Sequence, residues 1–434
     1  MRVIIPKRIS TAILNALQAG VVPRIGLEYL AVGRKREIET VLQDLEDLSS
    51  GAGVFRFIVG RYGSGKSFFL QALRNYAMDR DFVVADADLS PEKRLSGSGN
   101  QGLETYRELM QRLSTKLRPE GGALEAMLQK WISGIQQELR SEGEAGEDFP
   151  SRVEWKMFQL VSTMEDFAHG FDFARVVSAY YRAFLQGDDE KKRSAVRWLR
   201  GEYSTKTEAK AALQVGEIIT DENWYDYVKL FSAFSAKIGY RGLLLFIDEC
   251  VNLYKISNRQ SRENNYEKLL SLFNDVMQGK AGHLGIYLGG TPQFVEDTRR
   301  GLYSYAALKS RLGESRFARQ GYPDFTSPIL RLAQLRHEEI FVLLERITGI
   351  HAQHYDWTPP LGEEELTAFM ELVFSSPGAA EFITPREITR DFLSLLNILK
   401  DDSEADFYRI IKGGGFAFHR REERDDDLYA EFEF

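Results

Sequence analysis

Short apolar runs along the chain predict buried strands. They occupy residues 54–59 (VFRFIV), 82–88 (FVVADAD), 243–249 (LLLFIDE) and 284–289 (LGIYLG). The run at 243–249 is continuously apolar up to its acidic end, which is typical of a central strand covered on both faces of a parallel sheet. The pattern therefore predicts an α/β fold built on a central parallel sheet.

A helical pattern replaces these runs between residues 91 and 235. Apolar residues recur there at helical spacing, for example at Leu109 and Leu113. Amphipathic spacing returns near the C-terminus, for example at Ile340 and Leu344. We expect a large helical insertion in the sheet domain and a separate helical lid after it.

Composition narrows the class of protein. Hydrophobic residues make up 43% and charged residues 28% of the 434 residues, the balance of a folded protein with a sizeable core. No apolar run is long enough to cross a bilayer, and the N-terminus is typical of an amphipathic helix rather than a secretory signal. The single cysteine, Cys250, suits a reducing compartment. We expect a cytoplasmic protein without a membrane segment.

The clearest motif follows the first apolar run. Residues 60–67 read GRYGSGKS, a full G-x-x-x-x-G-K-S match between a predicted strand and a predicted helix. Glycines let backbone N–H groups surround phosphates, and the helix N-terminus adds a positive dipole end. Lys66 would reach the β- and γ-phosphates of ATP, and Ser67 would bind Mg²⁺. A glycine-rich turn without a ligand is the alternative. The predicted nucleotide-binding residues of this segment are Gly60, Gly63, Ser64, Gly65, Lys66, Ser67 and Phe68.

Two acidic residues close the apolar run at 243–249. Asp248 would hold the hydrated Mg²⁺ ion, and Glu249 would orient and deprotonate the attacking water. Thr291, after the run at 284–289, would lie near the γ-phosphate if its strand neighbours the Asp248 strand. Capping of the next turn by the Thr291 hydroxyl is an equally strong interpretation.

These motifs resemble those of AAA+ ATPases, in particular the branch of origin-recognition-like and signalling (STAND-like) ATPases. Gly33 and Arg34 lie in a segment, VGRKREI, that looks like the one found near the adenine in such proteins. The resemblance implies that Arg311, in ALKSRL, is an arginine finger acting on a neighbouring subunit, with Arg316 and Arg319 as alternatives. It also implies that Arg386, in ITPREI, contacts the γ-phosphate. A surface ion pair is the alternative for each candidate finger. Family members often carry Asn where this chain has Thr291.

A narrower resemblance is to the ATP-binding proteins of BREX systems, which bacterial phage-defence loci encode. It is carried by PRIGLE at residues 23–28, by the P-loop and by the long insertion between Lys66 and Asp248. It implies a small ATPase subunit that acts with a DNA methyltransferase and other defence subunits. The resemblances and the helical pattern together predict a P-loop AAA+ core within a chain of six segments. These are an N-terminal helical segment (1–48), a first part of the core (49–90), the helical insertion (91–235), a second part of the core (236–332), the helical lid (333–400) and a C-terminal tail (401–434).

The insertion contains one candidate for DNA contact. Arg193, Arg197 and Arg200 fall on one face of a predicted helix, and Trp198 is adjacent. A solvated helix face is the stronger interpretation, because acidic residues precede the arginines. The leading hypothesis is an oligomeric ATPase that uses Mg²⁺ and ATP to assemble or remodel a DNA-associated complex. A nucleotide-gated switch with little turnover, or an origin-like DNA loader, are its rivals.

Overall fold

The chain forms two units, each assembled from separate segments of the sequence. The computed structural model describes residues 4–162, 169–313, 324–375, 384–402 and 404–413. The sheet unit consists of Arg36–Val59 and Leu73–Arg331, and the terminal unit of Met1–Lys35, Gly60–Ala72 and Leu332–Phe434. The P-loop thus belongs to the terminal unit, whereas the strand that precedes it belongs to the sheet unit.

The sheet unit is built around a parallel sheet of five strands. The strands are β1 (Val54–Val59), β2 (Val83–Asp88), β3 (Leu243–Asp248), β4 (Leu284–Gly290) and β5 (Ile329–Arg331). Their order is β2-β3-β4-β1-β5, and every pair is parallel. The α/β class, the parallel sheet and four of the five strands agree with the sequence prediction. The short strand β5 was not predicted, because three residues carry no recognisable period.

The strand order decides which residues can meet at one edge. Strands β1, β3 and β4 run in the same direction, so their carboxyl ends lie at the same edge of the sheet. Strand β4 lies between β1 and β3. In β3 every residue before Asp248 is buried, as expected of a central strand with both faces covered. Asp248, at the end of β3, is therefore the first residue of this strand that is partly exposed to solvent.

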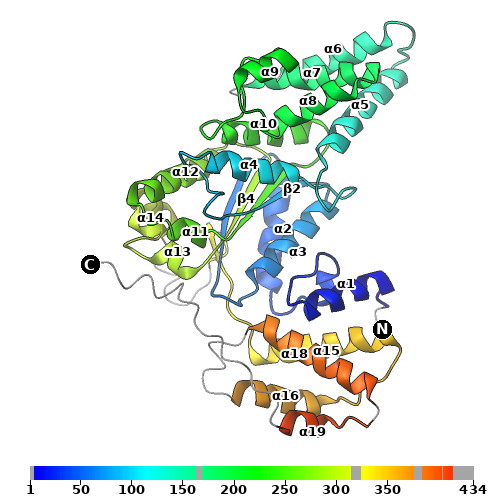
Figure 1. Ribbon diagram of the computed structural model, residues 1–434, viewed down its shortest axis with the longest axis vertical. Coiled ribbons are helices and arrows are strands. Elements are labelled where there is room, and N and C mark those ends of the chain that lie inside the picture. The colour runs from blue at the N-terminus through cyan, green and yellow to red at the C-terminus, as the bar shows by residue number, and fades with distance from the viewer. Residues whose placement is uncertain (1–3, 163–168, 314–323, 376–383, 403, 414–434) are drawn as a thin grey trace. The chain divides into compact units, whose positions relative to one another are not determined.

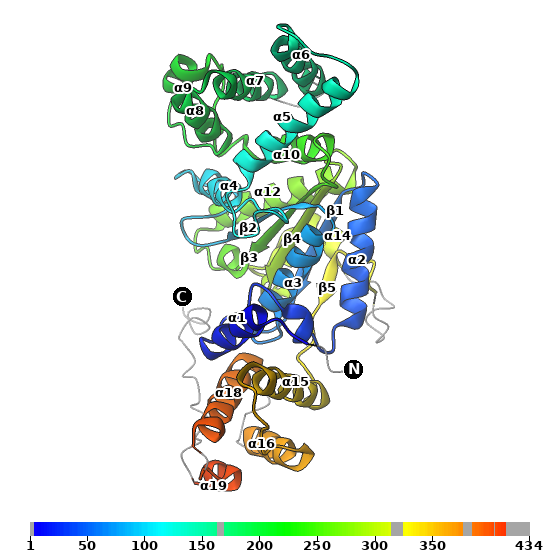
Figure 2. The same ribbon diagram turned by 90° about the vertical axis from the view of Figure 1, so that its right-hand side faces the viewer.

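A set of helices separates β2 from β3 in the sequence. They are α4 (Gln101–Gln111), α5 (Leu124–Ser141), α6 (Phe149–Ser162), α7 (Gly170–Gln186), α8 (Asp189–Leu199), α9 (Lys206–Leu213) and α10 (Trp224–Lys237). Helices α4 and α10 contact strands of the sheet, and α5 to α9 extend beyond them (Figures 1 and 2). One continuous apolar cluster joins strands and insertion, with Trp198, Trp224 and Tyr227 among its largest buried side chains.

The remaining helices of the sheet unit follow the other strands. They are α2 (Lys35–Ser49), α11 (Val251–Tyr254), α12 (Arg259–Met277), α13 (Pro292–Glu296) and α14 (Ala306–Leu312), with a 3₁₀ turn at Leu302–Ser304. Helix α3 (Lys66–Asp79) starts in the terminal unit and ends in the sheet unit. Asn258 caps α12 by accepting the N–H of Ser261.

The terminal unit is helical. It contains α1 (Lys7–Gln18), a 3₁₀ turn at Leu27–Tyr29, α15 (His337–Tyr355), α16 (Glu363–Ser375), α18 (Pro385–Asp401) and α19 (Phe407–Lys412). Their apolar faces share one core that includes Leu344, Phe369 and Phe392. Among the described residues, no helix is both long and apolar enough to cross a membrane.

The structure rules out Trp198 as a stacking platform for nucleic acid. Its side chain is 1% exposed, and its indole N–H donates to the carbonyl oxygen of Glu217. Arg197, on the same helix, pairs with Glu208 and stacks on Tyr203. Trp198 is thus a core residue of the insertion, because helical spacing turns it to the face opposite the exposed arginines.

Candidate functional site

The P-loop leaves β1 and enters α3 without interruption. Gly63 and Gly65 have φ of 77° and 85°, a left-handed conformation that glycine adopts without the steric penalty of a side chain. A Cβ at Gly63 would also lie 2.7 Å from the Thr384 methyl group, whereas a Cβ at Gly65 would meet nothing within 4 Å. One side of the loop is therefore packed on protein, and Gly65 faces open space.

The side chains of the P-loop fit a polyphosphate. The ammonium group of Lys66 donates to the carbonyl oxygens of Gly60 and Arg61, at 3.0 and 3.2 Å, so it is held over the loop. Lys66 and Ser67 begin a helix of 14 residues, whose N-terminus favours anions. The Ser64 hydroxyl is buried, and no hydrogen-bond partner for its oxygen lies in the described parts of the chain. Cation, helix end and unsatisfied hydroxyl suit the phosphates of ATP.

Arg34 fixes the P-loop from the side. Its guanidinium group is 8% exposed and donates to the carbonyl oxygen of Ser64 at 2.8 Å. The same nitrogen makes a short hydrogen bond to the carbonyl oxygen of Ala333, in the segment between β5 and α15. The resemblance to AAA+ ATPases implied that the segment containing Gly33 and Arg34 lies near the adenine. In the structure, Arg34 joins the P-loop to the chain that leads into the C-terminal helices.

Glu339 of α15 lies beside Gly33, the residue before Arg34. Gly33 has a φ of 66°, and a Cβ there would collide with the Glu339 carboxylate. Burial raises the pKa of Glu339. Hydrogen bonds from Arg336 and the charges of Arg336 and Arg34 lower this pKa by more, so it lies below its usual value. An ionised Glu339 thus completes the cap of α15 next to Gly33.

The start of α18 forms a second contact with the P-loop. Thr384 caps α18 in a reciprocal capping box with Glu387, and its methyl group packs on Gly63. Arg386, two residues on, is exposed, and its aliphatic stem lies beside Gly20 after α1. Phe68 packs against the apolar core of the same helices. The P-loop is therefore held by residues of the terminal unit.

The end of β3 places two carboxylates next to each other. Asp248 is half-buried and accepts the backbone N–H of Glu249 at 2.8 Å. Glu249 is exposed and has a φ of 56°, which costs about 1 kcal/mol or more for a residue with a Cβ. Backbone strain of this kind concentrates at functional positions. Burial raises the pKa of the next residue, Cys250, and the charges of Asp248 and Glu249 add to the shift. Its thiol is therefore inert.

These carboxylates do not form a protein cage for a metal. Over the described ranges, no three His, Cys, Asp or Glu side chains gather as a metal site. A magnesium ion that arrives with a nucleotide needs only one or two protein ligands, since phosphates and water supply the others. Ser67, exposed in the first turn of α3, and Asp248 have the oxygen donors that such an ion takes.

Thr291 follows β4, which lies between β1 and β3. Its strand thus neighbours the Asp248 strand, which is the condition under which Thr291 was expected near the γ-phosphate. Its hydroxyl accepts the N–H of Phe294 at 3.2 Å and caps α13. The capping interpretation is therefore confirmed, and contact with phosphate stays a prediction.

Arg311 is exposed on α14 of the sheet unit. Its Nε donates to the Asn274 side chain of α12 at 2.9 Å, and a second nitrogen donates to the carbonyl oxygen of Ala307. The guanidinium group has five N–H donors, so these contacts position it without using all of them. The alternatives Arg316 and Arg319 lie outside the described residues.

Sequence reasoning missed two of these contacts. Thr-Pro-Arg-Glu at 384–387 is a recognisable helix start, but nothing in it reveals that the Thr384 methyl group packs on the P-loop. Arg34 was identified, yet its carbonyl partners are 30 and 299 residues away along the chain. Only the folded terminal unit brings them together.

A comparison with protein families identifies the chain. A search of curated proteins gave no match. The model of the family described as "BREX system ATP-binding protein BrxC/D" matches residues 5–414. The narrower of the two sequence resemblances is thereby confirmed. Because the match covers nearly the whole chain, this protein belongs to the BREX family of ATP-binding proteins, whose systems defend bacteria against phages.

Proposed function

We propose that the protein is an AAA+ ATPase that binds and hydrolyses Mg-ATP to assemble or remodel a DNA-associated complex of the phage-defence system. Lys66 would bind the phosphates, with Ser67 and Asp248 holding the hydrated magnesium ion. The ion would neutralise charge on the transferred phosphoryl group. Glu249 would orient and deprotonate the attacking water.

One observation carries this proposal above the others. The P-loop combines an open face at Gly65, a lysine held over the loop and a buried hydroxyl without a partner in the described structure. Such an arrangement suits a bound polyphosphate. Glu249, strained and exposed after β3, is a group that nucleotide binding alone does not require.

We further propose that the active form is a homo-oligomer in the cytosol. Arg311 would serve the nucleotide of a neighbouring subunit, because it is exposed and already positioned by Asn274. Arg386 would report the state of the γ-phosphate to the C-terminal helices. Other subunits of the defence system would be the partners. Residues 333–400 would act as a lid, and residues 91–235 as an insertion that binds partners.

The test is Mg²⁺-dependent ATP turnover per protomer, measured against protein concentration. Glu249→Gln and Arg311→Ala should each lower turnover at least about a hundredfold, the scale of lost water activation or an arginine finger. Lys309→Ala, on the same short helix as Arg311, is the matched control and should keep turnover. Wild-type turnover should rise with concentration. Concentration-independent turnover that survives in Arg311→Ala would overturn the shared site.

A nucleotide-gated switch is the second candidate. The packing of Gly63 on Thr384 and the Arg34 hydrogen bond to Ala333 favour it, since both tie the P-loop to the C-terminal helices. A ligand that binds one arrangement of these helices more tightly would shift their population. Tight ATP binding without turnover at any concentration would select this function.

A further inference from the structure

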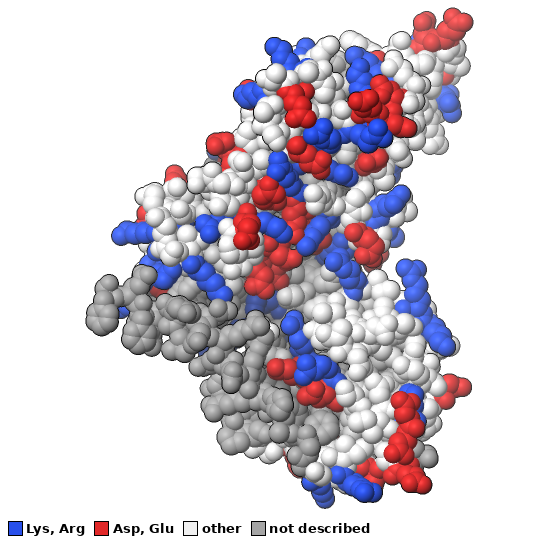
Figure 3. Space-filling model, viewed as in Figure 1, with Lys and Arg blue, Asp and Glu red and all other residues white. Residues whose placement is uncertain are grey.

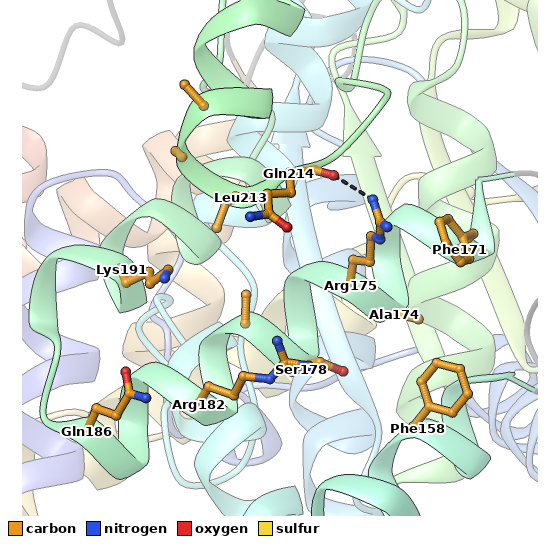
Figure 4. A pocket seen from close by; sticks show the side chains of 13 residues that line it. Phe158, Phe171, Ala174, Arg175, Ser178, Arg182, Gln186, Lys191, Leu213 and Gln214 are labelled. Atoms are coloured by element: carbon orange, nitrogen blue, oxygen red, sulfur yellow. Dashed lines mark hydrogen bonds between the residues drawn. The ribbon is translucent and has the colours of Figure 1, made fainter.

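A groove in the insertion combines aromatic and cationic side chains. Its cavity volume is about 510 Å³, and it lies between α6, α7, α8 and the end of α9. Figure 4 shows Phe158 and Phe171 at one end, Lys191 and Gln186 at the other, and Arg175, Ser178 and Arg182 between them. None of the described residues that line this groove is an Asp or a Glu. From its chemistry, we propose that the groove binds single-stranded nucleic acid.

The aromatic end offers faces on which bases can stack. Phe158 is 41% and Phe171 55% exposed, which is unusual for phenylalanine in a folded protein. Trp155, one turn before Phe158, is 61% exposed and stacked on it with ring centroids 6.4 Å apart. The guanidinium group of Arg175 lies 4.7 Å from the ring centroid of Phe171. Stacking on aromatic rings is the sequence-tolerant part of single-strand recognition.

The cations form a line that suits a phosphate backbone. Arg175 and Arg182 are seven residues apart and therefore share one face of α7, and Lys191 adds a charge from α8. Arg175 donates to the carbonyl oxygen of Gln214 at 2.6 Å, which leaves most of its N–H groups for a ligand. Arg182 pairs with Glu154 at 2.6 Å while 62% exposed. Such exposed pairs are weak, so a phosphate can compete.

A protein partner fits this groove less well. The cores of protein interfaces are depleted of charged residues, Lys above all, whereas cations run along this groove. Its larger apolar lining residues are two phenylalanines and Leu213, so an aliphatic anchor would find little packing. On the face seen in Figure 3, basic and acidic side chains alternate over the sheet unit without a broad basic patch. The groove is thus a local site for a narrow, flexible strand.

The inference deepens the proposed function, because it gives the ATPase its own contact with nucleic acid. It does not require ATP hydrolysis. Lys66→Ala should therefore bind oligonucleotides as the wild type does. Groove variants should keep their ATP turnover in the absence of nucleic acid. Failure of the two proposals can thus be told apart.

The experiment measures the fluorescence anisotropy of labelled oligonucleotides of about 12 nucleotides at several salt concentrations. The probes are single-stranded DNA, single-stranded RNA and duplex DNA. Lys191→Ala and Arg182→Ala should each weaken single-strand binding about threefold to tenfold and reduce the salt slope by about 0.7. Phe158→Leu removes a stacking face and should weaken binding about fivefold or more with an unchanged slope. Phe158→Trp should restore binding.

The matched control is Arg193→Ala, an exposed arginine on the same helix as Lys191 that does not line the groove. It should change affinity less than about twofold, since its charge stays in solvent. Equal losses in Arg193→Ala and Lys191→Ala would overturn the groove as the site. So would tighter binding of duplex than of single strands, or no oligonucleotide binding while an acidic peptide binds. Circular dichroism of each variant establishes that it is folded.

Discussion

The P-loop and a second glycine-rich loop both precede helices, yet they differ in what occupies the space beside their backbone. The P-loop, residues 60–65, presents its open side at Gly65. The second glycine loop, residues 96–102, precedes α4, and the carboxylate of Asp221 occupies it. That carboxylate accepts the N–H groups of Gly97, Gly102 and Leu103, at 2.9, 2.6 and 3.2 Å. The second glycine loop thus satisfies these N–H groups internally, whereas the P-loop has an open side at Gly65.

The contrast shows why a glycine-rich loop before a helix is not in itself an anion site. Both loops put backbone N–H groups at a helix N-terminus, where negative charge is favoured. In the second glycine loop the negative charge belongs to the protein, and Asp221 is 8% exposed. Asn265 adds two further contacts, to the N–H groups of Leu95 and Ser96. Hydrogen bonds of the second glycine loop therefore connect the start of α4 to the residues before α10 and to α12.

The largest effect is expected from removing the internal anion. Asp221→Ala leaves three backbone N–H groups without their acceptor, and bonds to a charged group contribute about 1.5–3 kcal/mol each. We expect a loss of about 4.5 kcal/mol or more in the free energy of unfolding of the sheet unit. Urea unfolding can be followed by tryptophan fluorescence, to which Trp224 contributes. Its indole N–H donates to the carbonyl oxygen of Leu95, which directly precedes this loop.

Asp221→Asn is the conservative control and should lose less, because one oxygen remains as an acceptor. Wild-type stability in Asp221→Ala would mean that water replaces the carboxylate. The two loops would then differ less than their hydrogen bonds indicate.

The opposite outcome is expected for the P-loop. Lys66→Ala should weaken ATP binding about a hundredfold, which corresponds to about 2.7 kcal/mol. Its free energy of unfolding should stay within about 0.5 kcal/mol of the wild-type value, because the partly exposed Lys66 ammonium group donates to carbonyl oxygens of its own loop. Isothermal titration with a non-hydrolysable ATP analogue measures the affinity. A large loss of stability would show that Lys66 serves the fold, as Asp221 does.

The sequence predicted the P-loop and its surrounding sheet better than the second glycine loop. The P-loop, the Asp248 strand and the parallel sheet follow from short-range patterns, because each is defined by neighbouring residues. The second glycine loop, SGSGNQG, has the composition of a flexible connection. Its ordering depends on Asp221, more than 100 residues away, and no local pattern announces that partner.

The same limit applied to the insertion. Its helices could be predicted from apolar spacing, but Trp198 was considered for the surface and lies in the core. The Arg175 and Arg182 pair was visible at a spacing of seven residues. Its meaning depended on the exposed rings of Phe158 and Phe171, which sequence alone would place in a core.

A smaller effect should come from the residue that fixes the P-loop from outside. Arg34→Ala leaves the carbonyl oxygens of Ser64 and Ala333 without a donor. We expect ATP affinity to fall about tenfold, or about 1.4 kcal/mol, since the loop loses part of its fixed geometry. Arg34→Lys should recover little, because an ammonium group lacks the planar fork. The control is Arg36→Ala, which removes an exposed neighbouring arginine and should leave the affinity unchanged.

The smallest effect separates packing on the P-loop from capping of a helix. Thr384 caps α18 and packs its methyl group on Gly63, whereas Thr205 caps α9 of the insertion. Alanine at either position should cost about 1 kcal/mol of stability through loss of the cap. Only Thr384→Ala should also weaken ATP binding. Thr384→Ser keeps the hydroxyl and removes the methyl group, so stability should be retained while affinity falls about twofold to threefold. If Thr384→Ser binds ATP as the wild type does, the methyl contact is incidental, and the P-loop holds its shape through Arg34 and its own hydrogen bonds.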